Sequence, residues 1–174
     1  MSGLLPLAGR ARRLGNDVNT DYIISSRRKR ETIDPTQLRR YLLEDIDAGF
    51  AASVRSGDIL VAGSNFGCGS AMEVAVTVVL GAGIRAVVAK SFSRTYLRNA
   101  LNNGLLALVA DTDGFAEGDP IELSSTTDGG VRLCNIATGR DTGCEPLPPF
   151  MQAMLEAGGL VPYLRAHGRF AAQP

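Results

Sequence analysis

Histidine and cysteine, which supply most zinc ligands and many catalytic bases, are scarce in this chain of 174 residues. It has one histidine, His167, and three cysteines, Cys68, Cys134 and Cys144, with no Cys-x-x-Cys spacing. Three thiols cannot complete a four-thiolate zinc or iron–sulfur site. His167 lies in a polar C-terminal segment, where we interpret it as a solvated surface residue. The composition therefore excludes most standard hydrolase and metalloenzyme designs for this chain by itself.

The chain also has no net charge, because 18 basic residues balance 18 acidic ones. No bulk electrostatic attraction to nucleic acid or to an anionic membrane follows. The charge is uneven, with nine Lys/Arg against four Asp/Glu in residues 1–40, which are therefore net +5. The apolar runs are far shorter than the roughly 18 residues of a membrane span, and no signal-peptide pattern is present. We expect a reducing, cytoplasmic setting with no membrane or nucleic-acid partner.

What is present is the composition of a folded protein, with 45% hydrophobic and 21% charged residues. The length predicts one domain over residues 1–174. The central pattern is a buried strand at 58–63, a glycine-rich turn at 64–70, a helix at 73–80 and a strand at 84–89. This order is typical of a right-handed crossover between parallel strands. The other expected elements are a strand at 4–14, a loop at 15–21, a buried run at 22–24, a helix from Asp34-Pro35 through Leu43, a helix at 96–103, a strand at 105–109, a β-hairpin-rich region at about 111–145 and a C-terminal helix at 151–157.

The turn Gly67-Cys68-Gly69-Ser70 is the first candidate site. A glycine-rich turn before a helix presents backbone N–H groups and the positive end of the helix dipole to an anion. The alternative is that Ser70 caps the helix, with Glu73 completing a capping box. Spacing alone favours the cap.

Three further segments carry candidate residues, each with a structural alternative. Asp21 can orient another group or stabilise its own turn. The block Arg27-Arg28-Lys29-Arg30 can bind carboxylates through charge-assisted hydrogen bonds or form a solvated loop. Arg94 follows the carboxyl end of a strand, where open α/β folds bind their ligands, or is a surface arginine.

Several of these segments occur together in one order: Asn19-Thr20-Asp21, 57–63, 65–70, 89–94, Arg98-Asn99-Ala100 and Asn103-Gly104-Leu105. In this order they resemble the small subunits of isopropylmalate isomerase (3-isopropylmalate dehydratase), which are homologous to the swivelling domain of aconitase. The likeness covers about residues 9–165. The ordered set, rather than any single motif, makes it specific.

The resemblance implies an α/β protein with the β/β/α swivelling-domain fold of the aconitase C-terminal domain. It further implies a hydro-lyase subunit of leucine biosynthesis, which dehydrates and rehydrates a hydroxy di- or tricarboxylic acid. A separate large subunit would carry a [4Fe-4S] cluster as Lewis acid, with no cofactor in this chain. Ser70 matches the family serine that removes a proton next to a carboxylate, and Asp21 matches a catalytic carboxylate. The residues expected to bind substrate are Arg28, Lys29, Arg30, Gly69, Ala71 and Arg94.

Two departures from the family pattern bear on which substrate is expected. The family usually continues Gly-Ser with Ser-Arg-Glu, whereas this chain has Ala71-Met72-Glu73, so Met72 replaces an arginine that grips a substrate carboxylate. Cations also stand at positions 28–30, where isopropylmalate enzymes tend to place an aromatic and an aliphatic residue. These cations favour an additional anionic group on the substrate.

Three interpretations follow from these departures. The basic block supplies the missing cation, or the substrate is that of a homoaconitase-like or other hydroxy-acid dehydratase, or the chain is a binding or regulatory module that has lost activity. Whether the isolated chain self-associates also stays open.

Overall fold

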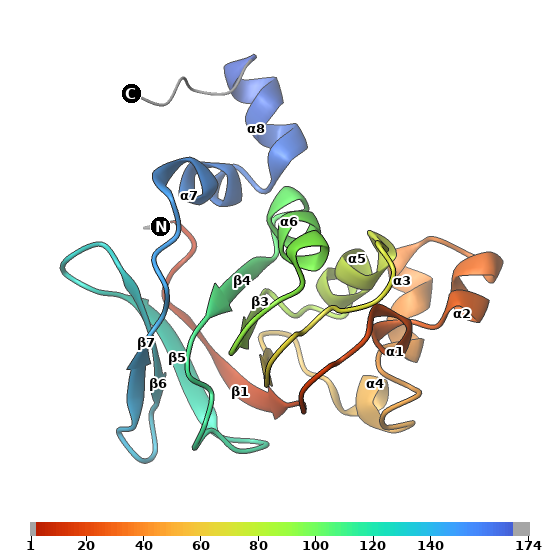
Figure 1. Ribbon diagram of the computed structural model, residues 1–174, viewed down its shortest axis with the longest axis horizontal. Coiled ribbons are helices and arrows are strands. Elements are labelled where there is room, and N and C mark those ends of the chain that lie inside the picture. The colour runs from red at the N-terminus through yellow and green to blue at the C-terminus, as the bar shows by residue number, and fades with distance from the viewer. Residues whose placement is uncertain (1–2, 169–174) are drawn as a thin grey trace.

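A computed structural model describes residues 3–168 (Figure 1). The elements in chain order are β1 (Leu7–Arg13), α1 (Thr20–Ile23), α2 (Ser26–Glu31), α3 (Pro35–Leu38), the 3-10 helix η1 (Arg39–Tyr41), α4 (Phe50–Ser53), β2 (Ile59–Ala62), α5 (Val74–Gly81), β3 (Ala86–Ala89), α6 (Arg94–Asn102), β4 (Leu106–Val109), β5 (Pro120–Ser125), β6 (Val131–Asn135), β7 (Asp141–Gly143), α7 (Pro149–Glu156) and α8 (Leu160–His167).

One sheet of seven strands, in the order β4-β3-β2-β1-β5-β6-β7, runs through the molecule. Strands β1 to β4 are parallel to one another, whereas β5 pairs antiparallel with β1 and begins the antiparallel part β5-β6-β7. The sheet therefore has a parallel half, whose carboxyl ends lie along one edge, and an antiparallel half.

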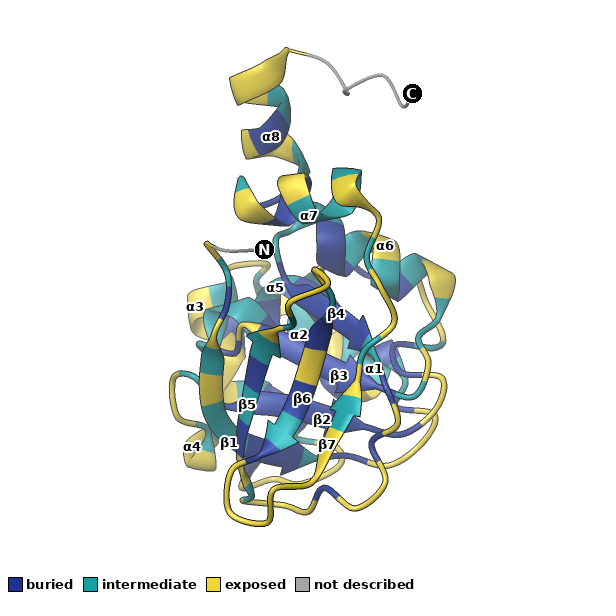
Figure 2. Ribbon diagram, turned by 90° about the vertical axis from the view of Figure 1, so that its left-hand side faces the viewer, coloured by how far each residue is buried: buried dark blue, intermediate teal, exposed yellow. Residues whose placement is uncertain are grey.

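Alternating side chains of the parallel strands bury two separate cores. In β2, Leu60 and Ala62 join a core under α1, α3 and α5, whereas Ile59 and Val61 join a second core with residues of β5, β6 and α7. Period-2 alternation in strands sends successive side chains to opposite faces. Because both faces are covered, β2 and β3 are buried throughout (Figure 2). This arrangement is the mixed α/β fold that the sequence predicts.

The β2-α5-β3 unit and strand β4 confirm the expectations for the centre of the sequence. Several local predictions are wrong. The expected buried run at 22–24 includes Tyr22, which is 51% exposed, and the expected loop at 15–21 runs into α1. The basic block is not a loop, since it forms α2, and the expected helix through Leu43 ends at Leu38. Leu43 adopts a left-handed φ of 59° after the 3-10 turn, yet it is fully buried. The spacing of the leucines up to Leu43 therefore indicates that their side chains are buried and not that they share one continuous helix.

The C-terminal region has two helices where the sequence predicts one. Helix α7 ends before Gly158 and Gly159, whose φ values are 90° and 115°, and α8 follows directly. Left-handed glycines commonly end a helix, and here the chain resumes a helix after them. Both helices lie beyond α6 at one end of the molecule (Figure 2).

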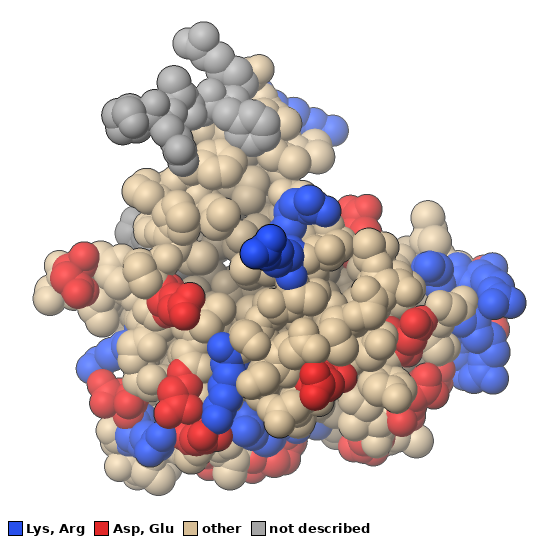
Figure 3. Space-filling view, viewed as in Figure 1, with Lys and Arg blue, Asp and Glu red and all other residues tan. Residues whose placement is uncertain are grey.

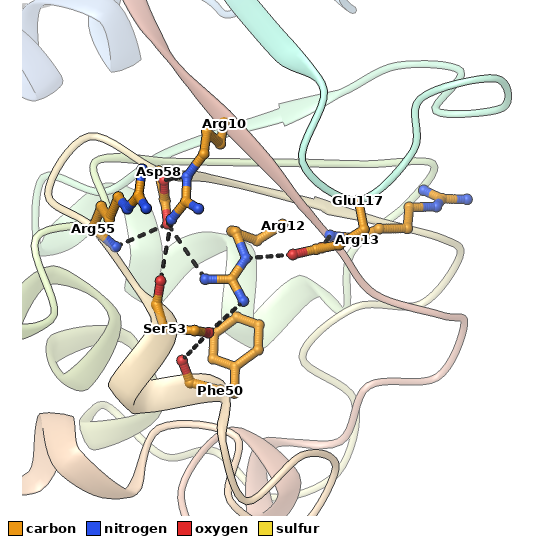
Figure 4. A network of polar contacts seen from close by, with 8 residues as sticks. All are labelled: Arg10, Arg12, Arg13, Phe50, Ser53, Arg55, Asp58 and Glu117. Atoms are coloured by element: carbon orange, nitrogen blue, oxygen red, sulfur yellow. Dashed lines mark hydrogen bonds and ion pairs between the residues drawn. The ribbon is translucent and has the colours of Figure 1, made fainter.

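A charged network on the amino-terminal side of β2 joins three segments (Figure 4). Asp58 accepts hydrogen bonds from Arg10 at 2.8 and 3.0 Å and from Arg12 at 3.3 Å, and Arg12 also donates to Glu117 at 2.7 Å. Arg12 further lies over the ring of Phe50 at 4.3 Å. The side chains of Arg12 and Asp58 are only 6% and 3% exposed, so both buried charges depend on the oppositely charged groups of this network for compensation.

Candidate functional site

Three loops meet where β1, β2 and β3 end. Backbone hydrogen bonds of 2.8 Å run from Gly67 N to Val18 O and from Thr20 N to Cys68 O. On the other side, Phe66 N donates to Ser91 O at 3.0 Å and Ser93 N to Phe66 O at 2.9 Å. The glycine-rich turn is therefore held between the loop after β1 and the loop after β3. This edge is where open α/β sheets bind their ligands.

Ser70 lies exposed at the end of this turn. It does not cap α5, because that helix begins at Val74 and Glu73 occupies its N-cap position without a side-chain hydrogen bond. The cap interpretation is thus wrong. The carbonyl of Ser70 accepts a hydrogen bond of 2.9 Å from Thr20 Oγ1, and this bond ties the serine to the segment that carries Asp21. The structure leaves the Ser70 hydroxyl without a capping role.

Backbone N–H groups of Gly69, Ser70 and Ala71 are the second feature of the turn. Among residues 3–168, none of these three donates to a protein acceptor. Successive N–H groups without acceptors can stabilise an anion that forms beside them. An alkoxide of Ser70 or a substrate carboxylate is such an anion.

Two glycines give the turn its path. Gly67 and Gly69 have φ values of 75° and 92°, in the left-handed region that glycine enters without strain. A Cβ at Gly67 would lie 2.2 Å from the ring of Tyr96, and one at Gly69 would lie 2.5 Å from the Asn19 side chain. Glycine at these positions lets α6 and the loop after β1 approach closely.

Asp21 is half-buried in the first turn of α1. The side chain of Asn19 caps this helix by accepting a hydrogen bond of 2.9 Å from Asp21 N. Ser26 Oγ donates to Asp21 Oδ1 at 2.6 Å. Asp21 is therefore not limited to stabilising its own turn, since it also connects α1 to α2.

The basic block on α2 divides into residues with different environments. The Arg28 guanidinium donates to both oxygens of Glu44 at 2.8 and 3.1 Å and stacks on Tyr41 at 3.7 Å. Hydrogen bonding to Glu44 raises the pKa of Arg28 above its usual value. The charge of Arg28 is thus compensated inside the protein, and its role in substrate binding stays a prediction.

Lys29 and Arg30 are placed differently. Lys29 Nζ lies 3.4 Å from Met72 Sδ, two residues beyond Ser70, so it belongs to the neighbourhood of the turn. Arg30 is exposed. Basic side chains gather over α2 at the right of Figure 3.

Arg94 is the first residue of α6, after the N-cap Ser93. Ser93 Oγ donates to Gly67 O at 2.6 Å and accepts from Tyr96 N, so it connects α6 to the turn. Arg94 is exposed and lines an apolar cleft of about 410 Å³ between α6, α7 and α8. Within the described part of the chain, no hydrogen bond or ion pair links its guanidinium to Ser70 or Asp21. Its role stays a prediction.

Sequence reasoning missed several residues that hold the site. Phe66 packs edge-on against Tyr96 at 5.1 Å and against Phe92 at 5.9 Å between ring centroids. Asn65 adopts a φ of 59° and donates to Asp17, which also has a positive φ. The role of Ser93 could have been predicted from the sequence, because a serine directly before a helix is a common N-cap. No pattern in the neighbouring sequence predicts the aromatic contacts or the positive φ values.

No three His, Cys, Asp or Glu side chains come together as metal ligands within residues 3–168. The free cysteines, Cys68, Cys134 and Cys144, lie on the turn, on β6 and just after β7. The residues of this chain therefore do not fit an iron–sulfur cluster. The helices in the same described range are also too short or too polar to cross a membrane.

Comparison with known proteins agrees with this geometry. Residues 16–113 match the family of the aconitase C-terminal domain. The chain is 45% identical over 161 residues to the 3-isopropylmalate dehydratase small subunit of Nitratidesulfovibrio vulgaris, covering 91% of this chain and 94% of that protein. The corresponding subunit of Moorella thermoacetica is 41% identical over 160 residues, with the same coverage.

A solved structure gives the same result in three dimensions. The crystal structure of 3-isopropylmalate dehydratase from Methanocaldococcus jannaschii superimposes with a TM-score of 0.87 at 40% identity, covering 94% of this chain and 96% of that one. The fold is therefore shared over nearly all of this chain. This chain belongs to the family of 3-isopropylmalate dehydratase small subunits, which is built on the aconitase C-terminal domain.

Proposed function

We propose that this chain is the small subunit of a hydro-lyase that isomerises 3-isopropylmalate by dehydration and rehydration, together with a large subunit. The observation that carries the proposal is identity of 38–45% to proteins of this name over at least nine-tenths of both chains. Because the match spans whole subunits, it includes the loops that form the site.

In this proposal Ser70 is the catalytic base, which takes the proton next to a substrate carboxylate on its Oγ. A serine hydroxyl is a weak acid, so its alkoxide needs stabilisation. The N–H groups of Gly69, Ser70 and Ala71 can provide it, because each is free of a protein acceptor within the described residues. Asp21 is held near this turn through Thr20 and Ser26, and we assign it to orienting substrate or the proton that is moved.

The remaining contacts to substrate are assigned by position. Gly69 and Ala71 would bind through backbone N–H groups, and Lys29, Arg30 and Arg94 through their cationic side chains. With Arg28 paired to Glu44, the block on α2 has less free charge than its sequence indicates. The argument for an additional anionic group on the substrate is accordingly weaker, and the relatives favour 3-isopropylmalate.

The cluster that the family resemblance implies would be held by the large subunit, because this chain does not bring suitable ligands together within residues 3–168. We therefore expect the purified chain to be colourless and inactive alone. The test mixes it with a cluster-loaded large subunit and measures turnover of 3-isopropylmalate, citrate, homocitrate and methyl-substituted malates. Bound iron in the single chain after anaerobic reconstitution, or preference of the complex for another acid, would contradict the proposal.

Removing the proposed base tests the site within the same complex. Ser70→Ala should lower kcat by about 10²- to 10⁴-fold, the usual contribution of general base catalysis, with the melting temperature unchanged. Ser64→Ala is the matched control, because Ser64 is an exposed serine earlier in the same turn. Near-normal turnover of Ser70→Ala would remove Ser70 from the catalytic residues.

A further inference from the structure

The cleft of about 410 Å³ between α6, α7 and α8 is apolar inside. Leu101 and Met154 in its wall are buried, whereas Leu97 and Met151 are only partly buried, so apolar surface remains open to the outside. Continuous apolar surface of this kind commonly marks a place where another molecule binds. The apolar lining consists of Leu97 and Leu101 from α6, Phe150, Met151 and Met154 from α7, and Leu160 from α8.

The polar side chains of the cleft all come from α6. Arg94, Arg98 and Asn102 follow one another at intervals of four residues and therefore lie along one side of that helix. Arg94 and Arg98 are exposed, and within residues 3–168 neither forms an ion pair with a carboxylate. Figure 3 shows basic side chains over α6 beside uncharged surface over α7. The cleft is thus apolar inside and cationic along one rim.

This rim connects the cleft to the candidate site. Ser93, which precedes Arg94, donates from Oγ to the carbonyl of Gly67 at 2.6 Å. The amino end of α6 therefore lies at the same edge of the sheet as the turn with Ser70, and the cleft extends from Arg94 along α6. In the proposed function the large subunit brings its cluster to the substrate at this edge, so it must cover the turn. A molecule that covers the turn and continues past Arg94 reaches the cleft.

We infer that this cleft is a contact surface for the large subunit, filled by an apolar side chain of that subunit with a neighbouring carboxylate that pairs with Arg98. The inference rests on the proposed function, which supplies the partner. Protein interfaces commonly combine an apolar centre with a polar rim, and Met, aromatic residues and Arg are enriched in them. A second copy of this chain fits less well, because a two-fold interface would bring the cationic rims of both copies together.

The affinity between the two subunits tests this contact. Arg98→Glu should raise the Kd for the cluster-loaded large subunit by about 10- to 100-fold, because a carboxylate would then face a carboxylate. Arg98→Lys, which keeps the charge, should lose little affinity. Met151→Gln, which places a polar amide in the cleft, should raise the Kd by about 5- to 30-fold. Surface plasmon resonance under anaerobic conditions measures these values.

Arg85→Glu is the matched control for the charge reversal. Arg85 is an exposed arginine directly before β3, at the opposite edge of the sheet, and its reversal should leave the Kd unchanged. At saturating large subunit, Arg98→Glu and Met151→Gln should both retain the wild-type kcat, because neither residue belongs to the proposed catalytic machinery. Their melting temperatures, expected to equal that of the wild type, check that both variants are folded.

Hydrogen exchange locates the contact without turnover. Binding of the large subunit should slow exchange of the amides in 94–102 and 149–156, where α6 and α7 line the cleft. Amides in 126–130, between β5 and β6, should exchange at an unchanged rate and serve as the internal control. Arg98→Glu should reduce the protection of α7 at a concentration of large subunit that saturates the wild type.

The outcomes separate this inference from the proposed function. If the wild-type complex turns over 3-isopropylmalate while both variants bind like the wild type and α7 is not protected, the inference fails and the function stands. If the subunits bind with protection of α6 and α7 but turn over no hydroxy acid, the function fails and the inference stands. If the isolated chain is a dimer that Met151→Gln dissociates without changing the affinity for the large subunit, the cleft joins two copies of this chain and the inference is overturned.

Discussion

At Gly67 two independent constraints exclude a side chain. Its φ of 75° is strained for any L-residue, and a Cβ would lie 2.2 Å from the Tyr96 ring. Tyr96 cannot easily move, since it is buried against Phe66 and Phe92. Burial also raises the pKa of the Tyr96 hydroxyl well above its usual value. The turn that ends in Ser70 thus depends on the packing of Gly67 against the Tyr96 ring.

Gly67→Ala should consequently destabilise the protein more than a substitution at another left-handed glycine. Gly139→Ala is the matched control, because Gly139 has a φ of 73° and a Cβ added there would meet no atom within 4 Å. We expect a loss of about 1–2 kcal/mol at Gly139 from backbone strain, and a further loss of about 1–3 kcal/mol at Gly67 from overpacking. Urea unfolding measures both, and equal losses would show that Tyr96 yields to the added methyl group.

Among the α-helices of the described residues, α2 stands out because none of its residues is buried. Its position depends on side-chain contacts: Ser26 with Asp21, Lys29 with Met72, and Arg28 with Glu44 and Tyr41. Glu44 and Tyr41 lie in the chain after α3, so these contacts join α2 to the neighbouring helical segment. A helix held in this way places Lys29 beside the turn without a hydrophobic face.

Removing either partner of the Arg28–Glu44 pair should loosen α2. Arg28→Gln and Glu44→Gln are each expected to increase hydrogen exchange of the amides in 26–31, and the double variant should exchange no faster than the worse single variant, because both remove one interaction. Arg27→Gln should leave exchange unchanged. Additive effects of the two substitutions would mean that Arg28 and Glu44 act on α2 separately.

On the scale of the whole molecule, the network around Asp58 connects the two halves of the sheet. Burial by itself would raise the pKa of Asp58, but hydrogen bonds from Arg10, from the backbone N–H of Arg55 and from Arg12 outweigh it and hold the pKa below its usual value. A carboxyl group with a lowered pKa in the folded state stabilises the protein at pH values above its unfolded pKa of about 4. This stabilisation is lost as the pH falls through the folded pKa.

Asp58→Asn should therefore destabilise the protein at neutral pH by about 3–5 kcal/mol, the usual cost of breaking a buried ion pair from one side. The difference between wild type and variant should shrink as the pH falls below about 4, because the unfolded wild-type protein then binds a proton at Asp58 that the folded protein binds only at lower pH. Unfolding free energies at pH 7, 5 and 3 measure this. A difference that is constant over this range would mean that Asp58 acts through its shape rather than its charge.

Local patterns in the sequence were sufficient for the parallel half of the sheet. The apolar run at 58–63, the glycines at 67, 69, 81 and 83 and the run at 84–89 specify strand, turn, helix and strand through interactions within a few residues. The sequence also predicts that Ser70 and Arg94 each follow a strand of this crossover unit. In the structure, a hydrogen bond from Thr20 to the Ser70 carbonyl connects the segment of Asp21 to that of Ser70. A second hydrogen bond, from Ser93 to the Gly67 carbonyl, connects the residue before Arg94 to the same turn.

Contacts between distant segments decided the rest. Ser70 is free of α5 because that helix starts at Val74, and Arg28 is paired because Glu44 lies 16 residues away in sequence but 2.8 Å away in space. Lys29 reaches Met72 across 43 residues, and Arg12 reaches Glu117 across 105. A sequence states which residues carry charge, but the partner of each charge is set by packing of elements far apart in the chain. Which cations remain free to bind substrate is for that reason a property of the tertiary structure.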